Sequence, residues 1–208
     1  MEAIHATLLT AIETWDDDVT KLGVVTRFDA AVDLLGVCPD ELLAYYPSKQ
    51  ISVVHCKSGK METYSLGKKG EDNYVQLYDK QLEVKEKNAK FGLKNKVPDT
   101  AVTRIEIRMK PDCKFSDLLV VKNPFKKLIL KTHYPETKQT ELWRLFIATA
   151  RFSGLQSALQ MLDPATRIKF QKRIQEYPSA WWKPDDVWKA WPGVVSGLCH
   201  SLGVELPD

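Results

Sequence analysis

Three stretches of the chain alternate between apolar and polar residues, which is the period of a β-strand with one buried face. In residues 74–78, tyrosine and glutamine alternate with valine and leucine. In residues 25–33, the arginine and aspartates alternate with phenylalanine, alanine and valine, and in residues 103–109, arginine and glutamate alternate with isoleucine and methionine. Stacked in one sheet, these strands would give an apolar face for a core. The second face would then hold tyrosine, carboxylate and guanidinium side chains.

The remaining pattern before residue 110 predicts a mixture of helices and antiparallel strands. Apolar residues at helical spacing predict an amphipathic helix over residues 3–22, and a short helix is expected at 39–46. Residues 51–56 and 61–66 are expected to form a hairpin that leads into the strand at 74–78. Residues 79–90 are strongly helical and nearly all charged, so this helix should be largely exposed.

The second half of the chain is predicted to be mainly helical. A short strand at residues 128–131 is followed by helices expected from residue 139 onward and at 154–161, 164–176 and 185–201. Asp163 and Pro164 supply a cap followed by proline at the first helical position. The pattern predicts an α+β fold in which helices back an antiparallel sheet. Residues 1–135 would form the α+β part, with the N-terminal helix and the antiparallel sheet, and residues 136–208 a helical segment packed on the sheet within the same domain.

Composition indicates an ordinary soluble protein. Of the 208 residues, 44% are hydrophobic and 27% charged, and the net charge is +3. No apolar run approaches the roughly 18 residues that cross a bilayer, and the N-terminus lacks the pattern of a signal peptide. We therefore expect a cytoplasmic protein with no membrane partner. The four cysteines have no CxxC spacing, so neither a zinc site nor a disulfide framework is indicated.

The charge is distributed unevenly, with ten lysines between residues 57 and 96. Lysines interleaved with aromatic residues suit a nucleic-acid surface, although lysines on exposed loops also simply improve solubility. The rings of the C-terminal aromatic cluster could stack on bases, but the favoured interpretation is that they pack the helical tail onto the sheet. This cluster comprises Tyr177, Trp181, Trp182, Trp188 and Trp191.

Phosphoryl transfer would give a reason for tyrosine, carboxylate and basic side chains on one sheet face. Oxygen ligands such as Asp29 and Glu106 suit Mg²⁺ or Mn²⁺. Arg27, Arg104 and Lys80 could bind phosphate oxygens. The alternative is a solvated face on which arginines and carboxylates pair across strands. Alternation alone favours the solvated face.

Four motifs in order along the chain resemble those of the replication initiation factor family. This family comprises rolling-circle replication initiators of plasmids and phages, with the relaxases of some integrative conjugative elements. Residues 25–33 resemble its T-R-hydrophobic-D strand, and residues 62–69 its T-x-Y-x-G-S-x-K/R hairpin. Residues 74–80 resemble its R-x-Y-D/E-K strand, and residues 103–108 its R-x-E-hydrophobic-R/K strand. The resemblance covers roughly residues 24–130, and each motif alone is short.

The resemblance implies a site-specific nick in one DNA strand, made by a tyrosine. Attack on the phosphate would leave a free 3′-hydroxyl and a 5′-phosphotyrosine link. The motif places the nucleophile at Tyr78, with Tyr64 as the alternative. Asp29 and Glu106 would hold Mg²⁺ or Mn²⁺. The basic residues implied in catalysis or nucleic-acid contact are Lys80, Arg104, Arg27, Lys68, Lys69 and Arg108.

The resemblance also implies partners. These are single-stranded or cruciform origin DNA in a bacterial cytoplasm, a host helicase and a second copy of the chain. Many family members carry a helix-turn-helix region before the catalytic domain, whereas only about 20 residues precede the first strand here. Origin recognition is therefore expected to rest on this domain or on another protein. The alternative function is a non-catalytic DNA-binding accessory protein derived from such an initiator.

Overall fold

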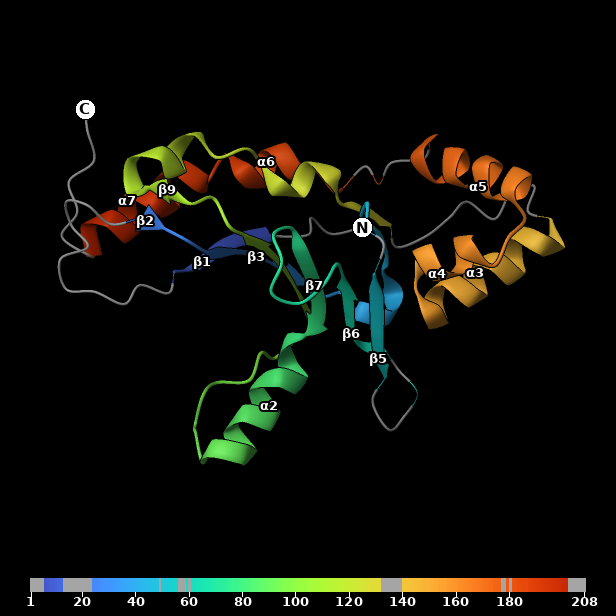
Figure 1. The fold of residues 1–208 in the computed structure, drawn as a ribbon. Coiled ribbons are helices and arrows are strands. Elements are labelled where there is room, and N and C mark those ends of the chain that lie inside the picture. The colour runs from blue at the N-terminus through green and yellow to red at the C-terminus, as the bar shows by residue number, and fades with distance from the viewer. Residues whose placement is uncertain are drawn as a thin grey trace.

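The computed structural model describes residues 6–12, 24–48, 50–55, 59, 61–131, 140–176, 179 and 181–201. Its centre is a six-stranded sheet in the order β1-β3-β8-β7-β6-β5, with every neighbouring pair antiparallel (Figure 1). The strands are β1 (Ala6–Ile12), β3 (Phe28–Leu35), β5 (Ile51–His55), β6 (Met61–Leu66), β7 (Tyr74–Asp79) and β8 (Val102–Met109). The predicted α+β fold with an antiparallel sheet is confirmed.

Shorter elements and the helices surround this sheet. Two small ladders pair β2 (Val24–Val25) with β9 (Cys113–Lys114) and β4 (Leu43–Tyr45) with β10 (Ile129–Lys131). The 3-10 helices are η1 (Pro39–Glu41), η2 (Phe115–Val120) and η3 (Pro124–Lys127). The α-helices are α2 (Lys80–Phe91), α3 (Glu141–Ser153), α4 (Leu155–Gln160), α5 (Pro164–Glu176), α6 (Pro184–Trp188) and α7 (Trp191–Ser201). None of the described helices has the length and apolar character of a membrane span.

The helix predicted over residues 3–22 is wrong where the structure describes it. Residues 6–12 form strand β1, which pairs along its whole length with β3, from Ala6 opposite Leu34 to Ile12 opposite Phe28. The sequence of β1 holds three β-branched residues in seven, and these fit a pleated strand at least as well as a helix. Pairing with β3 decides in favour of the strand over the helix. Residues 13–23 lie outside the described residues.

Three other predicted boundaries change, two of them because of strand pairing. The helix expected at 39–46 is reduced to η1, because Leu43–Tyr45 pairs with β10 as strand β4. The strand predicted at residues 25–33 is divided, because Val25 belongs to β2, which pairs with β9, while β3 begins at Phe28 and pairs with β8. The helix predicted at 185–201 is interrupted between α6 and α7. The cap at Asp163 is confirmed, since its Oδ1 accepts from the backbone N–H groups of Ala165 and Thr166.

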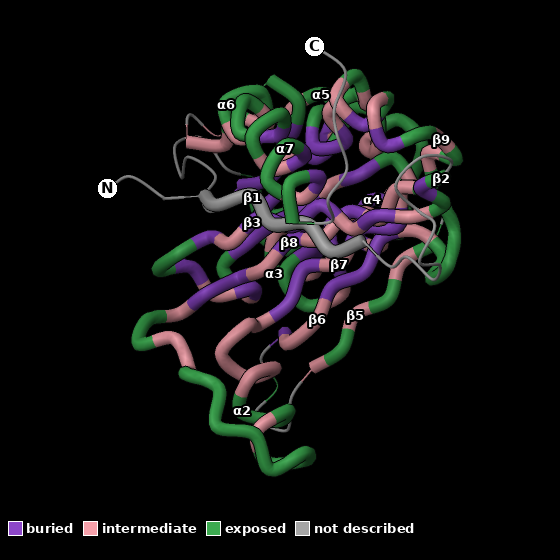
Figure 2. Tube along the Cα trace, turned by 90° about the vertical axis from the view of Figure 1, so that its left-hand side faces the viewer, coloured by how far each residue is buried: buried purple, intermediate pink, exposed green. Residues whose placement is uncertain are grey.

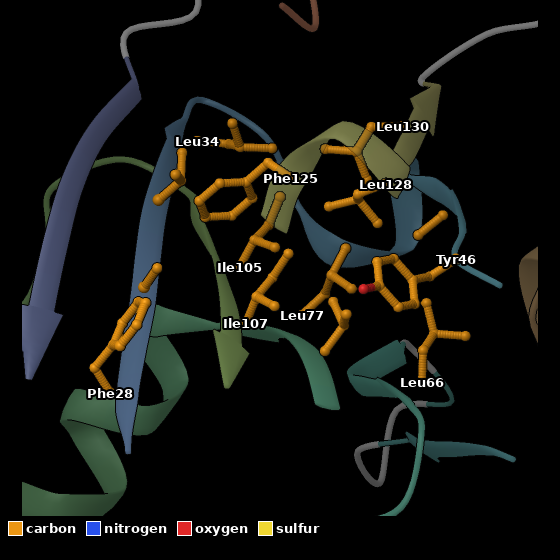
Figure 3. Close-up of a cluster of buried hydrophobic side chains, with 14 of the residues drawn as sticks. Phe28, Leu34, Tyr46, Leu66, Leu77, Ile105, Ile107, Phe125, Leu128 and Leu130 are labelled. Carbon is orange, nitrogen blue, oxygen red and sulfur yellow. The ribbon is translucent and has the colours of Figure 1, made fainter. Parts of the chain in front are cut away.

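The apolar face of the sheet carries the main core (Figure 3). Phe28, Leu77 and Ile105 are fully buried there, together with Phe125 of η3. On this face α7 packs against β3, with the ring centroids of Phe28 and Trp191 5.0 Å apart. The four tryptophans of the C-terminal cluster all belong to this core or pack against it, so the packing interpretation is confirmed for them. Tyr177 lies outside the described residues.

A second, smaller core holds α3, α4 and α5 together beyond the β5 edge of the sheet (Figure 1). Trp143, Phe146 and Phe170 meet there ring to ring, and Leu43 of β4 joins them. The junction between α3 and α4 is Gly154, whose φ of 87° favours glycine. A Cβ at Gly154 would lie 2.5 Å from the ring of Tyr64, so this junction sits directly on β6.

Candidate functional site

The polar face of the sheet is organised in three cross-strand rows. The central strands β3, β8 and β7 are neighbours, as their alternation predicts. The rows are Asp29, Arg108 and Tyr74; then Ala31, Glu106 and Gln76; then Asp33, Arg104 and Tyr78. The face therefore combines acidic, basic and phenolic groups, and it is turned away from α7. The first and third rows are about 13 Å apart along β7.

The third row presents a tyrosine hydrogen-bonded to a carboxylate. Tyr78 Oη donates to Glu106 Oε1 at 2.7 Å. Beside it, Arg104 donates through Nε and Nη2 to the two oxygens of Asp33, at 2.6 and 2.7 Å. Arg104 is the residue opposite Tyr78 in the register of β7 and β8. The two-pronged pair fixes the guanidinium beside the phenol.

Next to Tyr78 lies an open cleft of about 220 Å³. It is bounded by β6, β7, β8 and the first turns of α2, and its lining residues are Glu62, Thr63, Gln76, Tyr78, Asp79, Glu83, Glu86 and Glu106. Two of these carboxylates are engaged locally. Asp79 Oδ1 caps α2 by accepting from Leu82 N, and Glu83 forms ion pairs with Lys80 and Lys87. The cleft thus places Tyr78 among carboxylates, with lysines at its rim.

The environment of Tyr78 keeps its phenol protonated. Burial raises the pKa of Tyr78 above its usual value, and the negative charge and hydrogen bond of Glu106 raise it further. Glu83 adds to this effect, while Arg104 opposes it. A reaction at this oxygen therefore needs a group that takes its proton, and Glu106 is already in hydrogen-bond contact with that proton.

The first row is built around Asp29, which is held by two arginines. Arg27 donates to its two oxygens at 3.3 and 2.6 Å, and Arg108 donates to the same oxygens at 3.0 and 3.1 Å. Burial alone would raise the pKa of Asp29. The hydrogen bonds and positive charge of the arginines outweigh burial and hold that pKa below its usual value. Asp29, Arg27 and Arg108 thus stabilise one another across β3 and β8.

This arrangement does not fit the predicted metal pair. Both oxygens of Asp29 are occupied by guanidinium groups, whose positive charge opposes a cation. Glu106 faces the cleft, and its Oε1 accepts from Tyr78. Across the described residues, no group of three or more His, Cys, Asp or Glu side chains is placed to hold a metal ion. We therefore derive no chemical step through a metal.

Replacing Asp29 with asparagine is expected to lower stability by about 1–3 kcal/mol near neutral pH, because two arginines lose their carboxylate. The folded-state pKa of Asp29 lies below 3.8, so its contribution is complete above that pH and is lost as pH falls further. Urea unfolding between pH 6 and pH 2.5 should show a shallower acid dependence for Asp29→Asn than for the wild type. Asp99→Asn, at an exposed ion pair with Lys96, is the control expected to change little. A change of stability in Asp99→Asn as large as in Asp29→Asn would contradict this account.

The other predicted residues fall into separate places. Lys80 opens α2, pairs with Glu83 and has its Nζ 5.9 Å from the ring centroid of Tyr78. Tyr64 lies on the opposite, apolar face, in register with Val53 and Leu77, and is 2% exposed. The structure does not bring it together with Tyr78.

Lys68 and Lys69 are exposed in the turn before β7, at the far end of that strand from Tyr78. Lys68 lies 3.5 Å from Glu71. The predicted residues that do meet at the cleft end are Tyr78, Glu106, Arg104 and Lys80.

The pattern did not single out several residues of this site. Asp33 continues the alternation of β3, so the sequence could have predicted that it lies on the same face as Arg104, which it opposes in the structure. Glu83 and Glu86 follow Tyr78 by one and two helical turns, which places them over the cleft once α2 is known to begin at Lys80. Glu62 enters through the pairing of β6 with β7, which the sequence predicts as successive antiparallel strands without giving the register that brings Glu62 to the cleft.

Comparison with known proteins adds a partial likeness to a solved structure. No protein-family model matches the chain, and no curated protein matches it. A solved structure described as a rolling circle replication initiator protein from Geobacillus stearothermophilus is similar, with 15% identity and a TM-score of 0.28. The match covers 64% of this chain and 58% of that one, so the chain spans less than two thirds of that protein's length. A likeness of this size carries no argument about fold or function.

Proposed function

We propose that the protein is a rolling-circle replication initiator of the relaxase type, which nicks one strand of origin DNA through Tyr78. The observation that carries the proposal is the 2.7 Å hydrogen bond from the Tyr78 phenol to Glu106 at an open cleft. The order of the four motifs along the chain supports the same function. In this proposal the protein acts in the cytoplasm of a bacterial cell.

The proposed reaction is a transesterification. As Tyr78 Oη attacks the scissile phosphorus, Glu106 takes the phenolic proton. The new bond joins the tyrosine oxygen to phosphorus, and the bond from phosphorus to the 3′ oxygen breaks. The departing oxygen takes a proton from water and becomes the free 3′-hydroxyl. The downstream strand stays attached as a 5′-phosphotyrosine, which a later 3′-hydroxyl can attack to rejoin the DNA.

Two basic groups would act on the phosphate. Arg104 is fixed by Asp33 beside the phenol, so it is held in position before the substrate arrives. Lys80 is paired with Glu83 at the rim of the cleft. Approach of the phosphate would exchange part of that ion pair for a contact with the substrate. Both groups would offset the negative charge that the lining carboxylates place near the scissile bond.

A labelled-strand assay tests the proposal. The protein is incubated with single-stranded DNA from the origin of its own element, labelled at either the 5′ or the 3′ end, and run on a denaturing gel. We expect the 3′-labelled strand to move with the protein and the 5′-labelled fragment to be released. Tyr64→Phe should behave as the wild type, because Tyr64 lies on the apolar face. Loss of the adduct in Tyr64→Phe, or attachment to the 5′-labelled fragment, would contradict the assignment.

The same assay with EDTA, Mg²⁺ and Mn²⁺ tests metal dependence, which stays a prediction of the motif resemblance. The geometry of Asp29 makes it a structural residue in this proposal. If a cation is required, Asp29→Asn should therefore leave the metal concentration for half-maximal adduct formation unchanged.

A non-catalytic DNA-binding accessory protein is the second candidate. The observation that favours it is the same acidic cleft, because carboxylates repel the phosphate that a nicking enzyme must bring to Tyr78. Such a protein would bind DNA in a salt-dependent manner. It would yield no adduct with either labelled strand and under any metal condition.

A further inference from the structure

Residues 80–101, which comprise α2 and the loop that follows it, form an arm that contributes nothing to either core. None of these residues is buried, and none belongs to either buried hydrophobic cluster. In Figure 1 the arm projects from the sheet on the side opposite α6 and α7, and Figure 2 shows it only in the colours of exposed and intermediate residues. Packing therefore does not account for this segment.

The arm is nevertheless ordered by its own hydrogen bonds. Gly92 ends α2 with a φ of 64°, and the loop then folds back along the helix. Asn88 makes a reciprocal pair with the backbone of Asn95, at 2.8 and 3.1 Å, and Gln81 donates to the carbonyl of Pro98 at 2.7 Å. A surface presented by the arm is thus preorganised, which reduces the entropy lost on binding.

The arm carries an excess of positive charge. Residues 80–101 contain six lysines, two glutamates and one aspartate. Lys80 and Lys87 pair with Glu83, and Lys96 lies near Asp99. Within the described chain, the other three, Lys85, Lys90 and Lys94, make no ion pair, so their charges are available to an anionic partner.

Two large apolar side chains lie among these lysines. Phe91 is 61% exposed and Leu93 is 46% exposed. Lys90 Nζ lies 5.1 Å from the centroid of the Phe91 ring, which still leaves most of the ring open to solvent. An exposed aromatic ring surrounded by cations provides a stacking platform for a nucleobase beside contacts for its phosphates.

The arm is anchored at the candidate active site. Its helix begins directly after Tyr78 and Asp79, and its loop returns to β8, which carries Arg104 and Glu106. The 12 residues of α2 extend about 18 Å from that point. The arm thus extends from the place of Tyr78 to Phe91, the last residue of α2, and offers a surface beside any strand whose phosphate lies at Tyr78.

We propose that the arm binds single-stranded DNA next to the scissile phosphate, with Phe91 stacking on a base and the three unpaired lysines contacting phosphates. This inference deepens the proposed function, because it names the surface that leads the strand to Tyr78. Single-stranded DNA is favoured over duplex because a paired base has no free face for Phe91. The excess of six lysines over three carboxylates in the arm favours phosphates over a neutral or basic protein partner.

Binding of a fluorescent 20-nucleotide oligo(dT), measured by anisotropy between 50 and 200 mM salt, tests the inference. Phe91→Ala should weaken binding at least about fivefold, and Phe91→Tyr should restore it. A triple variant, Lys85→Gln with Lys90→Gln and Lys94→Gln, should reduce the slope of log affinity against log salt by about 2. The matched control neutralises the exposed lysines Lys122, Lys127 and Lys169 and should leave the slope unchanged.

The measurement is made in the Tyr78→Phe background without added metal, so a failure of nicking does not affect it. Unchanged affinity in Phe91→Ala together with equal slopes for the arm and control triple variants would overturn the inference. Equal affinity for a duplex would remove the stacking role and overturn it as well. Competition by polyglutamate as effective as by unlabelled oligo(dT) would assign the arm to an acidic protein instead.

Discussion

Replacing Tyr78 with phenylalanine is expected to abolish covalent capture of DNA, with a loss on the order of 10³-fold or more. The substitution removes only the hydroxyl, so the nucleophile is lost while the ring keeps its place on β7. Glu106 loses one hydrogen bond, which costs about 1 kcal/mol of stability. The denaturing gel with 3′-labelled strand measures the loss, and circular dichroism checks that the variant is folded.

Tyr74→Phe is the matched control for this experiment. Tyr74 lies on the same face of the same strand, and its hydroxyl donates to Ser65 at 3.0 Å. It belongs to the first row, away from the cleft, so the variant should form the adduct at the rate of the wild type. Covalent capture by Tyr78→Phe at that same rate would eliminate Tyr78 as the nucleophile.

Replacing Glu106 with glutamine is expected to slow adduct formation by about 10²–10⁴-fold, the range for loss of a general base. The amide oxygen can still accept the hydrogen bond from Tyr78, but it cannot take the proton. Burial continues to hold the pKa of Tyr78 above its usual 10, so the reaction then depends on the small fraction of phenolate. Its rate should rise about tenfold for each pH unit between pH 7 and pH 9.

Glu62→Gln separates this role from a general effect of charge. Glu62 also lines the cleft, but Tyr78 donates its hydrogen bond to Glu106. Removing the Glu62 charge should leave the pH profile of the wild type unchanged. A profile that becomes as steep in Glu62→Gln as in Glu106→Gln would mean that lost cleft charge, rather than a lost base, controls the rate.

Alternation predicted the two faces of the central strands correctly. Val75 and Leu77 are buried in the core, and Tyr78 faces the cleft, because side chains of a strand point to alternate sides whatever its neighbours are. The same local rule was insufficient at residues 6–12 and 43–45. Both segments are strands only because a partner strand runs beside them. Pairing over long sequence separations overrode the local pattern there.

The site was less predictable than the sheet, because it depends on register. The hydrogen bond between Tyr78 and Glu106 joins residues 28 positions apart, and it requires Arg104 to lie directly opposite Tyr78. A shift of one residue would have turned Glu106 into the core. Tyr64 illustrates the same dependence, since its motif suggested a nucleophile and its register with Leu77 buries it. No pattern within a single strand contains that information.

The position of the arm between two paired strands means that its length and sequence can be changed without disturbing the sheet. Asp79 and Thr103 are direct partners at the ends of β7 and β8, so the arm is the connection of a β-hairpin. Their Cα atoms are held about 5 Å apart by pairing, a gap that a short turn also closes. Shortening the connection to a few residues would lower the closure cost by about 1–2 kcal/mol. The arm can therefore be deleted, lengthened or replaced between Asp79 and Thr103, and every strand of the sheet would keep its partner.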